Sequence, residues 1–263
     1  MAIYNITSQQ LKGTGILNSF EMSGVGSFSN VYSLNFDGSD EYATIGDITA
    51  LEFNRTDAFS ISCWFKADAS ENAAIFTKAD SGNDFAGWQL ATLSSGGKNK
   101  ISFRLRKTNS VKVRLDTTAI FNLNEWHHVI TTYDGSGTNT GLKVYVNGTN
   151  QGGTRSGTLG SDLAENAFPV NIGVRNNSDF FFNGKIDEVA VFNSELSSEN
   201  VTLIYNSGIP NDISDLSPLG WWRMGDKSTF DGTDYTLVDQ GSGGNNATTV
   251  NIEQNDREKD IPS

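Results

Sequence analysis

The stretch NEWHHVITTYDGS, residues 124–136, followed by KVYVNGT, residues 143–149, decides the fold of this chain. A run rich in β-branched and aromatic residues ends at Asp134–Gly135, and a second alternating run ends at Asn147–Gly148. Asp-Gly and Asn-Gly supply the positive φ angles that tight turns between antiparallel strands require. The sequence therefore predicts adjacent strands of an antiparallel sheet here.

Strand signals recur along the chain. Residues 59–66 alternate with period 2, which places Phe59, Ile61, Cys63 and Phe65 on one face. Residues 101–106 and 111–116 alternate in the same way and predict a hairpin around residues 107–110.

The outward face of that predicted hairpin carries Arg104, Arg106, Lys112 and Arg114, a basic ladder on an acidic protein. We favour the interpretation that these side chains form a solvated face paired with neighbouring carboxylates. An anion-binding patch is the alternative.

Composition agrees with a folded, turn-rich β protein. The 263 residues include 27 glycines and 4 prolines, and the net charge of −12 argues against nucleic acid or an anionic membrane as partner. Residues 1–10 lack the features of a signal peptide, no stretch predicts a membrane-inserted segment, and Cys63 has no second cysteine to pair with.

A helix is predicted over residues 196–208. Ser197 is the expected N-cap, Val201, Ile204 and Tyr205 form the buried stripe, and Gly208 is expected to end the helix.

Two further segments, LNFDGSDEY at 34–42 and FNGKIDEVAVFN at 182–193, complete a set of four with residues 124–136 and 143–149. In this order and spacing the set resembles the laminin-G-like branch of the concanavalin A-like jelly rolls, over roughly residues 31–208. The resemblance implies an all-β antiparallel sandwich of jelly-roll topology with one short helix.

The closing segment GWWRMGD, residues 220–226, and the loop 239–249 are similar to the opening unit of many laminin-G-like domains. We therefore expect residues 209–250 to complete the same sandwich in permuted order, within a jelly roll of residues 31–250. Residues 1–30 predict an arm that is either mobile or ordered against a neighbouring subunit. Residues 251–263 predict a charged tail on the surface. The closing segment also resembles the ends of structural proteins of tailed phages.

Catalysis is not expected. Enzymes of this fold carry Glu-x-Asp-x-(x)-Glu on one strand, whereas here Glu-x-Asp occurs at Glu258–Asp260, in the tail. Asp187 and Glu188 are adjacent, so they are predicted to point to opposite faces, as are His127 and His128. No spacing suggests a catalytic triad.

Calcium (Ca²⁺) is the cofactor that the resemblance implies, because many laminin-G-like relatives bind it through loop carboxylates and carbonyls. The candidate ligands are Asp37, Asp40, Asp134 and Asp187. The competing interpretation is that Asp37 and Asp134 cap turns and that Asp187 bonds a loop backbone.

Carbohydrate binding is a further possibility for the aromatic and amide side chains. Consecutive rings at 180–182 must place at least one on the outer face, where an interface contact is the competing role. The candidate ligand-binding residues are Trp88, Asn176, Asn177, Asp179 and Phe181.

Three functions follow. The first is a non-enzymatic virion structural protein (a capsid decoration, fibre or tail-associated subunit) that assembles with copies of itself or other virion proteins and contacts host cell-surface glycans. The second is an exported, extracellular carbohydrate-binding or adhesion module. The third, a glycan-cleaving enzyme, is disfavoured by the missing carboxylate pair.

Overall fold

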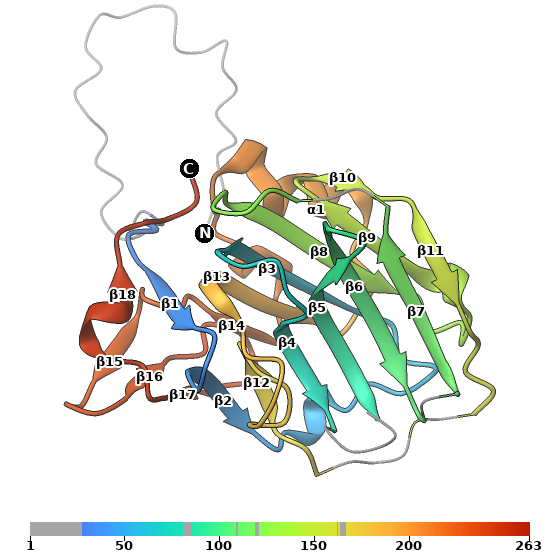
Figure 1. Cartoon of the computed structure of the whole chain (residues 1–263), viewed down its shortest axis with the longest axis horizontal. Helices are drawn as coiled ribbons and strands as arrows, with labels where there is room; N and C mark the ends of the chain where they lie inside the picture. The colour runs from blue at the N-terminus through green and yellow to red at the C-terminus, as the bar shows by residue number, and fades with distance from the viewer. Residues whose placement is uncertain (1–27, 81–85, 109, 119–120, 162, 164–166) are drawn as a thin grey trace, which may run out of the picture.

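Two antiparallel β-sheets packed face to face form this protein (Figure 1). The computed structural model describes residues 28–80, 86–108, 110–118, 121–161, 163 and 167–263. Within these residues, eight strands form one sheet and ten form the other. The predicted all-β sandwich is confirmed.

The eight-stranded sheet, called sheet A, has the strand order β10-β9-β8-β3-β13-β1-β18, and β14 also pairs with β13. Its strands are β1 (Ser33–Asp37), β3 (Phe59–Ala67), β8 (His127–Tyr133), β9 (Leu142–Val146), β10 (Thr149–Asn150), β13 (Asn183–Phe192), β14 (Gly220–Trp222) and β18 (Arg257–Glu258).

The ten-stranded sheet, called sheet B, has the order β11-β7-β6-β5-β4-β12-β2-β17-β16-β15. In Figure 1 its strands β4 to β7 lie in front of β3 and β8 of sheet A. Its strands are β2 (Tyr42–Gly46), β4 (Ala74–Ala79), β5 (Gly87–Ser95), β6 (Lys98–Arg106), β7 (Lys112–Thr117), β11 (Gly153–Ser156), β12 (Val170–Ile172), β15 (Ser228–Phe230), β16 (Tyr235–Leu237) and β17 (Ala247–Val250).

The core between the sheets is built by the period-2 alternation of the strands. Phe59, Ile61, Cys63 and Phe65 are all fully buried, as predicted. The Phe59 ring stacks on Phe53 with 4.1 Å between centroids. The predicted 101–106 and 111–116 hairpin is present as β6 and β7, with Phe103 opposite Leu115.

The helix α1 (Ser198–Tyr205) lies on the outside of sheet A. The Ser197 side chain accepts a hydrogen bond from the backbone of Asn200, as expected of an N-cap. The helix ends at Asn206, earlier than predicted, because Asn206 already adopts a left-handed φ of 45°. Short 3-10 helices are η1 (Thr49–Leu51), η2 (Asn139–Gly141), η3 (Asn206–Gly208), η4 (Ser214–Leu216) and η5 (Gln254–Asp256).

A second apolar cluster covers the outer face of sheet A. The helix buries Val201 and Ile204 against this face, and Tyr205 stacks on Trp64 with 6.0 Å between ring centroids. His128 faces this cluster and His127 faces Phe65 in the main core, so the two histidines point to opposite faces as predicted. Burial lowers the pKa of His128 to about 3, so this side chain is neutral.

The closing part of the chain joins both sheets. In sheet A, β14 pairs with β13, and in sheet B, β17 pairs with β2. The charged tail lies along the edge of sheet A, where β18 pairs with β1 and Asp260 accepts from Lys66 at 2.8 Å and from Trp126 at 2.9 Å. The arm falls largely outside the described residues, whose first member, Phe28, stacks on Trp221.

The prediction that Asp187 and Glu188 point to opposite faces is wrong. The register of β13 against β3 shifts between Asp187 and Ala190, and Glu188 has a φ of 48°, so an extra residue is inserted here. Ile186 and Val189 on either side face the core. Both carboxylates therefore lie on the outside of sheet A.

The two carboxyls are buried and held by hydrogen bonds. Glu188 accepts from Arg223 Nε at 2.9 Å and from Trp221 Nε1 at 2.6 Å, while Asp187 accepts from Asn30 Nδ2 at 2.8 Å. Burial and the neighbouring Glu188 charge hold the pKa of Asp187 well above its ordinary value. Burial also raises the pKa of Glu188 to about 7, although Arg223 opposes this.

Replacing Glu188 with glutamine should therefore change how stability depends on pH. A carboxyl whose pKa rises from 4.5 to about 7 on folding stabilises the folded state below pH 4.5, and this contribution is lost as pH rises through 7. The free energy of unfolding of Glu188→Gln, relative to wild type, should thus increase from pH 4.5 to 7. Urea unfolding at several pH values measures this difference, with Glu125→Gln, at an exposed position, as the control. Parallel pH curves for Glu188→Gln and wild type would contradict the expectation.

Candidate functional site

The four predicted calcium ligands do not form one site. Asp37 is the last residue of β1 and lies near Ala67 of β3, whereas Asp134 follows β8 beside Phe59, at the other end of β3. Nine residues of β3 separate these ends, which is on the order of 25 Å. Asp187 lies between them, fully buried on the outside of sheet A.

Asp37 and Asp134 act as turn residues. Asp37 Oδ1 accepts from the backbone N–H of Ser39 at 2.7 Å and of Asp40 at 3.3 Å. Asp134 Oδ1 accepts from the backbone of Ser136 at 2.8 Å. Across the part of the chain that the structure describes, no group of three or more Asp, Glu, His or Cys side chains is arranged to hold a metal ion.

Trp88 lies in the main core, so its predicted role as a sugar platform is wrong. The side chain is 1% exposed, and its Nε1 donates to the Leu51 carbonyl at 2.8 Å. The alternation of β5 explains this: Trp88 points inward, against Phe59 and Phe76, and the next residue, Gln89, points outward.

The other predicted ligand-binding residues share the loop 173–182 between β12 and β13. Asn176 and Asn177 form its turn with φ angles of 47° and 58°. Asp179 accepts from Arg175 Nε at 2.9 Å, and the Arg175 guanidinium lies 4.0 Å from the centroid of the Phe180 ring.

The aromatic part of this loop reaches β2. Phe181 is half-buried, with its ring centroid 6.4 Å from that of Tyr42. Tyr42 alternates with the buried Ala43, so it lies on the outer face of sheet B. The loop therefore sets two aromatic rings beside that face.

A row of polar side chains crosses the outer face of sheet B. The strand registers set Arg114 opposite Arg104, Arg104 opposite Gln89, Gln89 opposite Thr77 and Thr77 opposite Asn171. These five residues, called the outer-face row, come from the adjacent strands β7, β6, β5, β4 and β12. They are positioned by the backbone ladder rather than by a mobile loop.

The middle of the outer-face row is recessed and incompletely hydrogen-bonded. Arg104 donates to Gln89 Oε1 at 2.9 Å, and Thr77 donates to the Val174 carbonyl at 3.0 Å. Asn171 is fully buried, yet neither its amide oxygen nor its amide nitrogen has a partner within the described chain, and the same holds for Gln89 Nε2. Buried amides without partners are rare. These lie on the outer side of sheet B, but other side chains cover them.

The expected pairing of the basic ladder with carboxylates is found at Arg114, whose Nε lies 2.7 Å from Asp116 Oδ1. Arg104, in contrast, contacts the neutral amide of Gln89. Burial lowers the pKa of Arg104 to about 9, and the charges of Arg106, Arg114 and Arg175 add to this effect. The row thus lies in a positive local field on an acidic protein.

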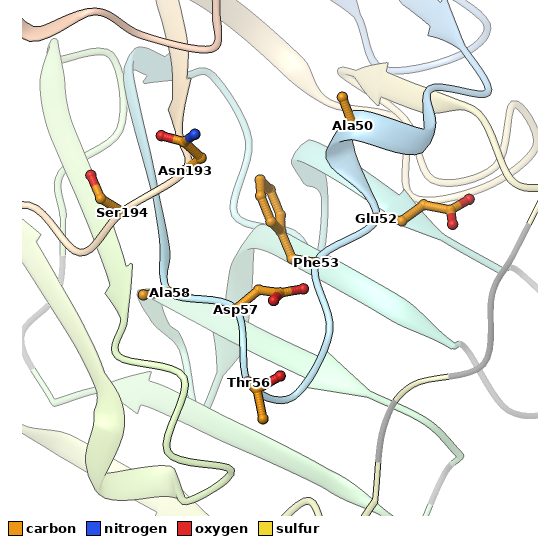
Figure 2. Close-up of a pocket in the computed structure, with 8 residues that line it drawn as sticks. All are labelled: Ala50, Glu52, Phe53, Thr56, Asp57, Ala58, Asn193 and Ser194. Carbon is orange, nitrogen blue, oxygen red and sulfur yellow. The ribbon is translucent and has the colours of Figure 1, made fainter.

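A separate hollow of about 420 Å³ lies at the rim of the sandwich. Figure 2 shows Asn193 and Ser194 on one side of it, with Phe53 pointing between them and the 50–58 loop. Its two carboxylates have partners in the chain, because Glu52 lies 3.5 Å from Lys78 Nζ and Asp57 accepts from the backbone of Asn54. The full lining is Ala50, Glu52, Phe53, Thr56, Asp57, Ala58, Asn193 and Ser194.

A two-sheet jelly roll with a polar, rigid outer face defines a lectin-like β-sandwich. Residues 37–202 match the family described as the concanavalin A-like lectin/glucanases superfamily, and the chain belongs to it. The resemblance noted in the sequence is thereby confirmed. No helix among the described residues has the length and apolar character needed to cross a membrane.

Solved structures share this fold. A Bacteroides ovatus protein assigned to carbohydrate binding is similar, with a TM-score of 0.62, 20% identity and coverage of 89% of this chain and 62% of that one. The Ruminococcus gnavus IT-sialidase CBM40, solved with α2,6-sialyllactose, gives a TM-score of 0.52 and 15% identity. The match covers 68% of this chain and 100% of that one.

A curated relative is far longer than this chain. The adhesion G-protein coupled receptor V1 of Danio rerio is 23% identical over 171 residues, which cover 64% of this chain and 3% of the receptor.

Sequence reasoning found two members of the outer-face row, Arg104 and Arg114, and missed Thr77, Gln89 and Asn171. The alternation of β5 predicts that Gln89 points outward, because Gln89 follows the inward-facing Trp88. Asn171 lies in a three-residue strand, which carries too little alternation to reveal its face.

Replacing Asn171 with leucine, of similar volume, should stabilise the fold. A buried amide without partners destabilises a protein by about 1–3 kcal/mol, and an apolar side chain removes that penalty. Urea unfolding should give a higher free energy of unfolding for Asn171→Leu than for wild type. A loss of stability instead would mean that the amide is hydrogen-bonded in the free protein.

Proposed function

We propose that this chain is a non-catalytic carbohydrate-binding module whose site is the outer face of sheet B. The observation that carries the proposal is the outer-face row, in which Gln89, next to Arg104, and Asn171, two strands further along, keep buried amide atoms without hydrogen-bond partners. A sugar presents hydroxyl groups that both donate and accept, which suits an amide such as Asn171 with both kinds of atom free.

The surroundings of the row support the same ligand class. Tyr42 and Phe181 lie beside it with part of each ring exposed. Aromatic rings pack against the apolar face of a sugar, while polar groups fix its orientation. Five hydrogen-bonded strands hold the backbone of the row, and the side chains that cover the buried Asn171 must move for a sugar to reach it.

The comparisons favour this alternative over the virion role. The solved structures described above include a protein assigned to carbohydrate binding and a module solved with a bound sialylated sugar. The virion role rests on the resemblance of residues 220–226 to phage proteins, and it stays a prediction together with self-assembly.

The test is binding to a glycan array, followed by titration calorimetry of each glycan found. Asn171→Leu should weaken binding about tenfold or more, because a sugar hydroxyl then loses its partners inside a desolvated site. The control is Asn150→Leu, the same exchange at an exposed position of β10 in sheet A. Wild-type affinity in Asn171→Leu would contradict the proposed site.

The mass in solution separates the module from the virion subunit. A binding module can work as a monomer, and light scattering would then give about 28.5 kDa. A defined multiple of that mass would favour assembly into a symmetric particle component.

A further inference from the structure

Two lysines lie directly opposite each other on the outer face of sheet A. Lys66 of β3 pairs with Lys185 of β13. Each follows or precedes a core residue, Phe65 and Ile186, so both side chains point away from the core. Like charges opposite each other across two strands destabilise a sheet. An anion close to both ammonium groups therefore stabilises this part of sheet A.

The tail supplies that anion. Asp260 Oδ2 accepts from Lys66 Nζ at 2.8 Å and lies 3.7 Å from Lys185 Nζ. Glu258 Oε2 lies 3.6 Å from Lys185 Nζ. The other oxygen of Asp260 accepts from Trp126 Nε1 at 2.9 Å. Both lysines are thus paired with the Glu-x-Asp pattern of the tail.

Charges alternate along the tail with the period of a strand. Acidic residues stand at positions 256, 258 and 260, and basic residues at 257 and 259. In an extended segment the two kinds of side chain point to opposite sides. In β18, Glu258 points to Lys185, while the Arg257 guanidinium lies 3.7 Å from the centroid of the Tyr32 ring. A shift of one residue would bring a basic side chain to the lysines, so charge helps to fix the register.

The backbone of the tail is recognised as well. In Figure 1, β18 lies beside β1 at the edge of sheet A, and the register sets Ser33 opposite Glu258. The Ser33 hydroxyl donates to the Asp260 carbonyl at 2.7 Å. When an extended peptide adds to a sheet edge, main-chain hydrogen bonds give affinity and side-chain contacts give specificity. The edge of β1 and the lysine pair provide both parts of such a site.

The segment that fills this site is short and partly exposed. Strand β18 has two residues, and residues 259–263 continue it without strand or helix. The side chains of Glu258 and Asp260 keep 39% and 35% of their surface exposed. Ion pairs that are this exposed contribute little to stability, and short segments at the edge of a fold open without global unfolding.

We propose that the edge of β1 and the Lys66–Lys185 pair form a recognition site for an extended acidic peptide of the pattern Glu-x-Asp, and that the tail occupies this site as an internal competitor. The ligand is a peptide rather than a sugar, because β18 pairs with β1 through its backbone. This proposal goes beyond carbohydrate binding and concerns the other sheet, so either one can fail without the other.

The experiment uses the full chain and a fluorescently labelled peptide of residues 256–263, DREKDIPS. A tethered segment competes at an effective concentration on the order of millimolar, so wild type should bind the peptide weakly. The double variant Glu258→Ala with Asp260→Ala weakens the internal competitor and leaves the lysines in place. Fluorescence anisotropy should show at least about tenfold tighter binding to this variant than to wild type.

Two further variants locate the site. Lys66→Met, added to the double variant, should remove the gain in affinity, because one ammonium group of the pair is lost. Glu195→Ala is the matched control: it removes the carboxylate of the Lys143–Glu195 ion pair, elsewhere on sheet A, and should bind the peptide as wild type does. A peptide with both carboxylates replaced by amides should bind none of these proteins.

Several results would overturn the proposal. They are equal affinity of the double variant and wild type, equal binding of the amide peptide, and binding of oligogalacturonate, an acidic sugar, without the peptide. Hydrogen exchange of wild type gives a test that needs no variant. The amides that join β1 to β18 should exchange faster than those that join β3 to β8, since the tail opens locally. Equal protection would mean that the tail is a fixed part of the sheet.

Discussion

The alternation of side chains along the strands of sheet B is the constraint on which both the core and the candidate site depend. In β5, Trp88 enters the core and Gln89 faces outward, and in β6, Phe103 and Arg104 do the same. A shift of one residue in pairing would exchange these faces. The apolar residues that fix the register therefore also fix the outer-face row.

The two sheets use their outer faces differently. Sheet A is covered by α1 and the apolar cluster around Trp221, and its bulge buries Asp187 and Glu188 beneath residues 28–30. Sheet B directs arginines and amides outward. Buried carboxyls in sheet A have hydrogen-bond partners in the chain, whereas Asn171 in sheet B has none. The proposed binding role of Asn171 rests on this difference.

Local patterns in the sequence were sufficient for much of the fold. Asp134–Gly135, Asn147–Gly148 and the alternation of residues 59–66 indicated strands that the structure contains. Failures came where the outcome depends on tertiary contacts. The bulge at Glu188 has no local signature, so the faces of Asp187 and Glu188 were assigned wrongly.

The candidate site, like the fold, was predictable where it depends on local alternation and not where it depends on tertiary contacts. The basic ladder of Arg104 and Arg114 was visible from alternation, but its partners were not, because Asn171 and Arg175 reach it from a strand and loop far along the chain. The alternation that directs Gln89 to the outer side of sheet B also places Trp88 in the core. Spatial neighbours contributed by distant segments are what a single sequence leaves undetermined.

The pairing of β1 with the last strand of the chain has a kinetic consequence. Ser33 donates its hydroxyl to the Asp260 carbonyl across 227 residues of sequence, and β1 also pairs with β13 in the second half of the chain. Contacts of such separation must wait for large loops to close, and proteins dominated by them fold slowly. During synthesis, β1 leaves the ribosome long before its partners exist. The edge of sheet A is therefore completed only once β18 has emerged, and before β13 emerges β1 is an unpaired strand available to other chains.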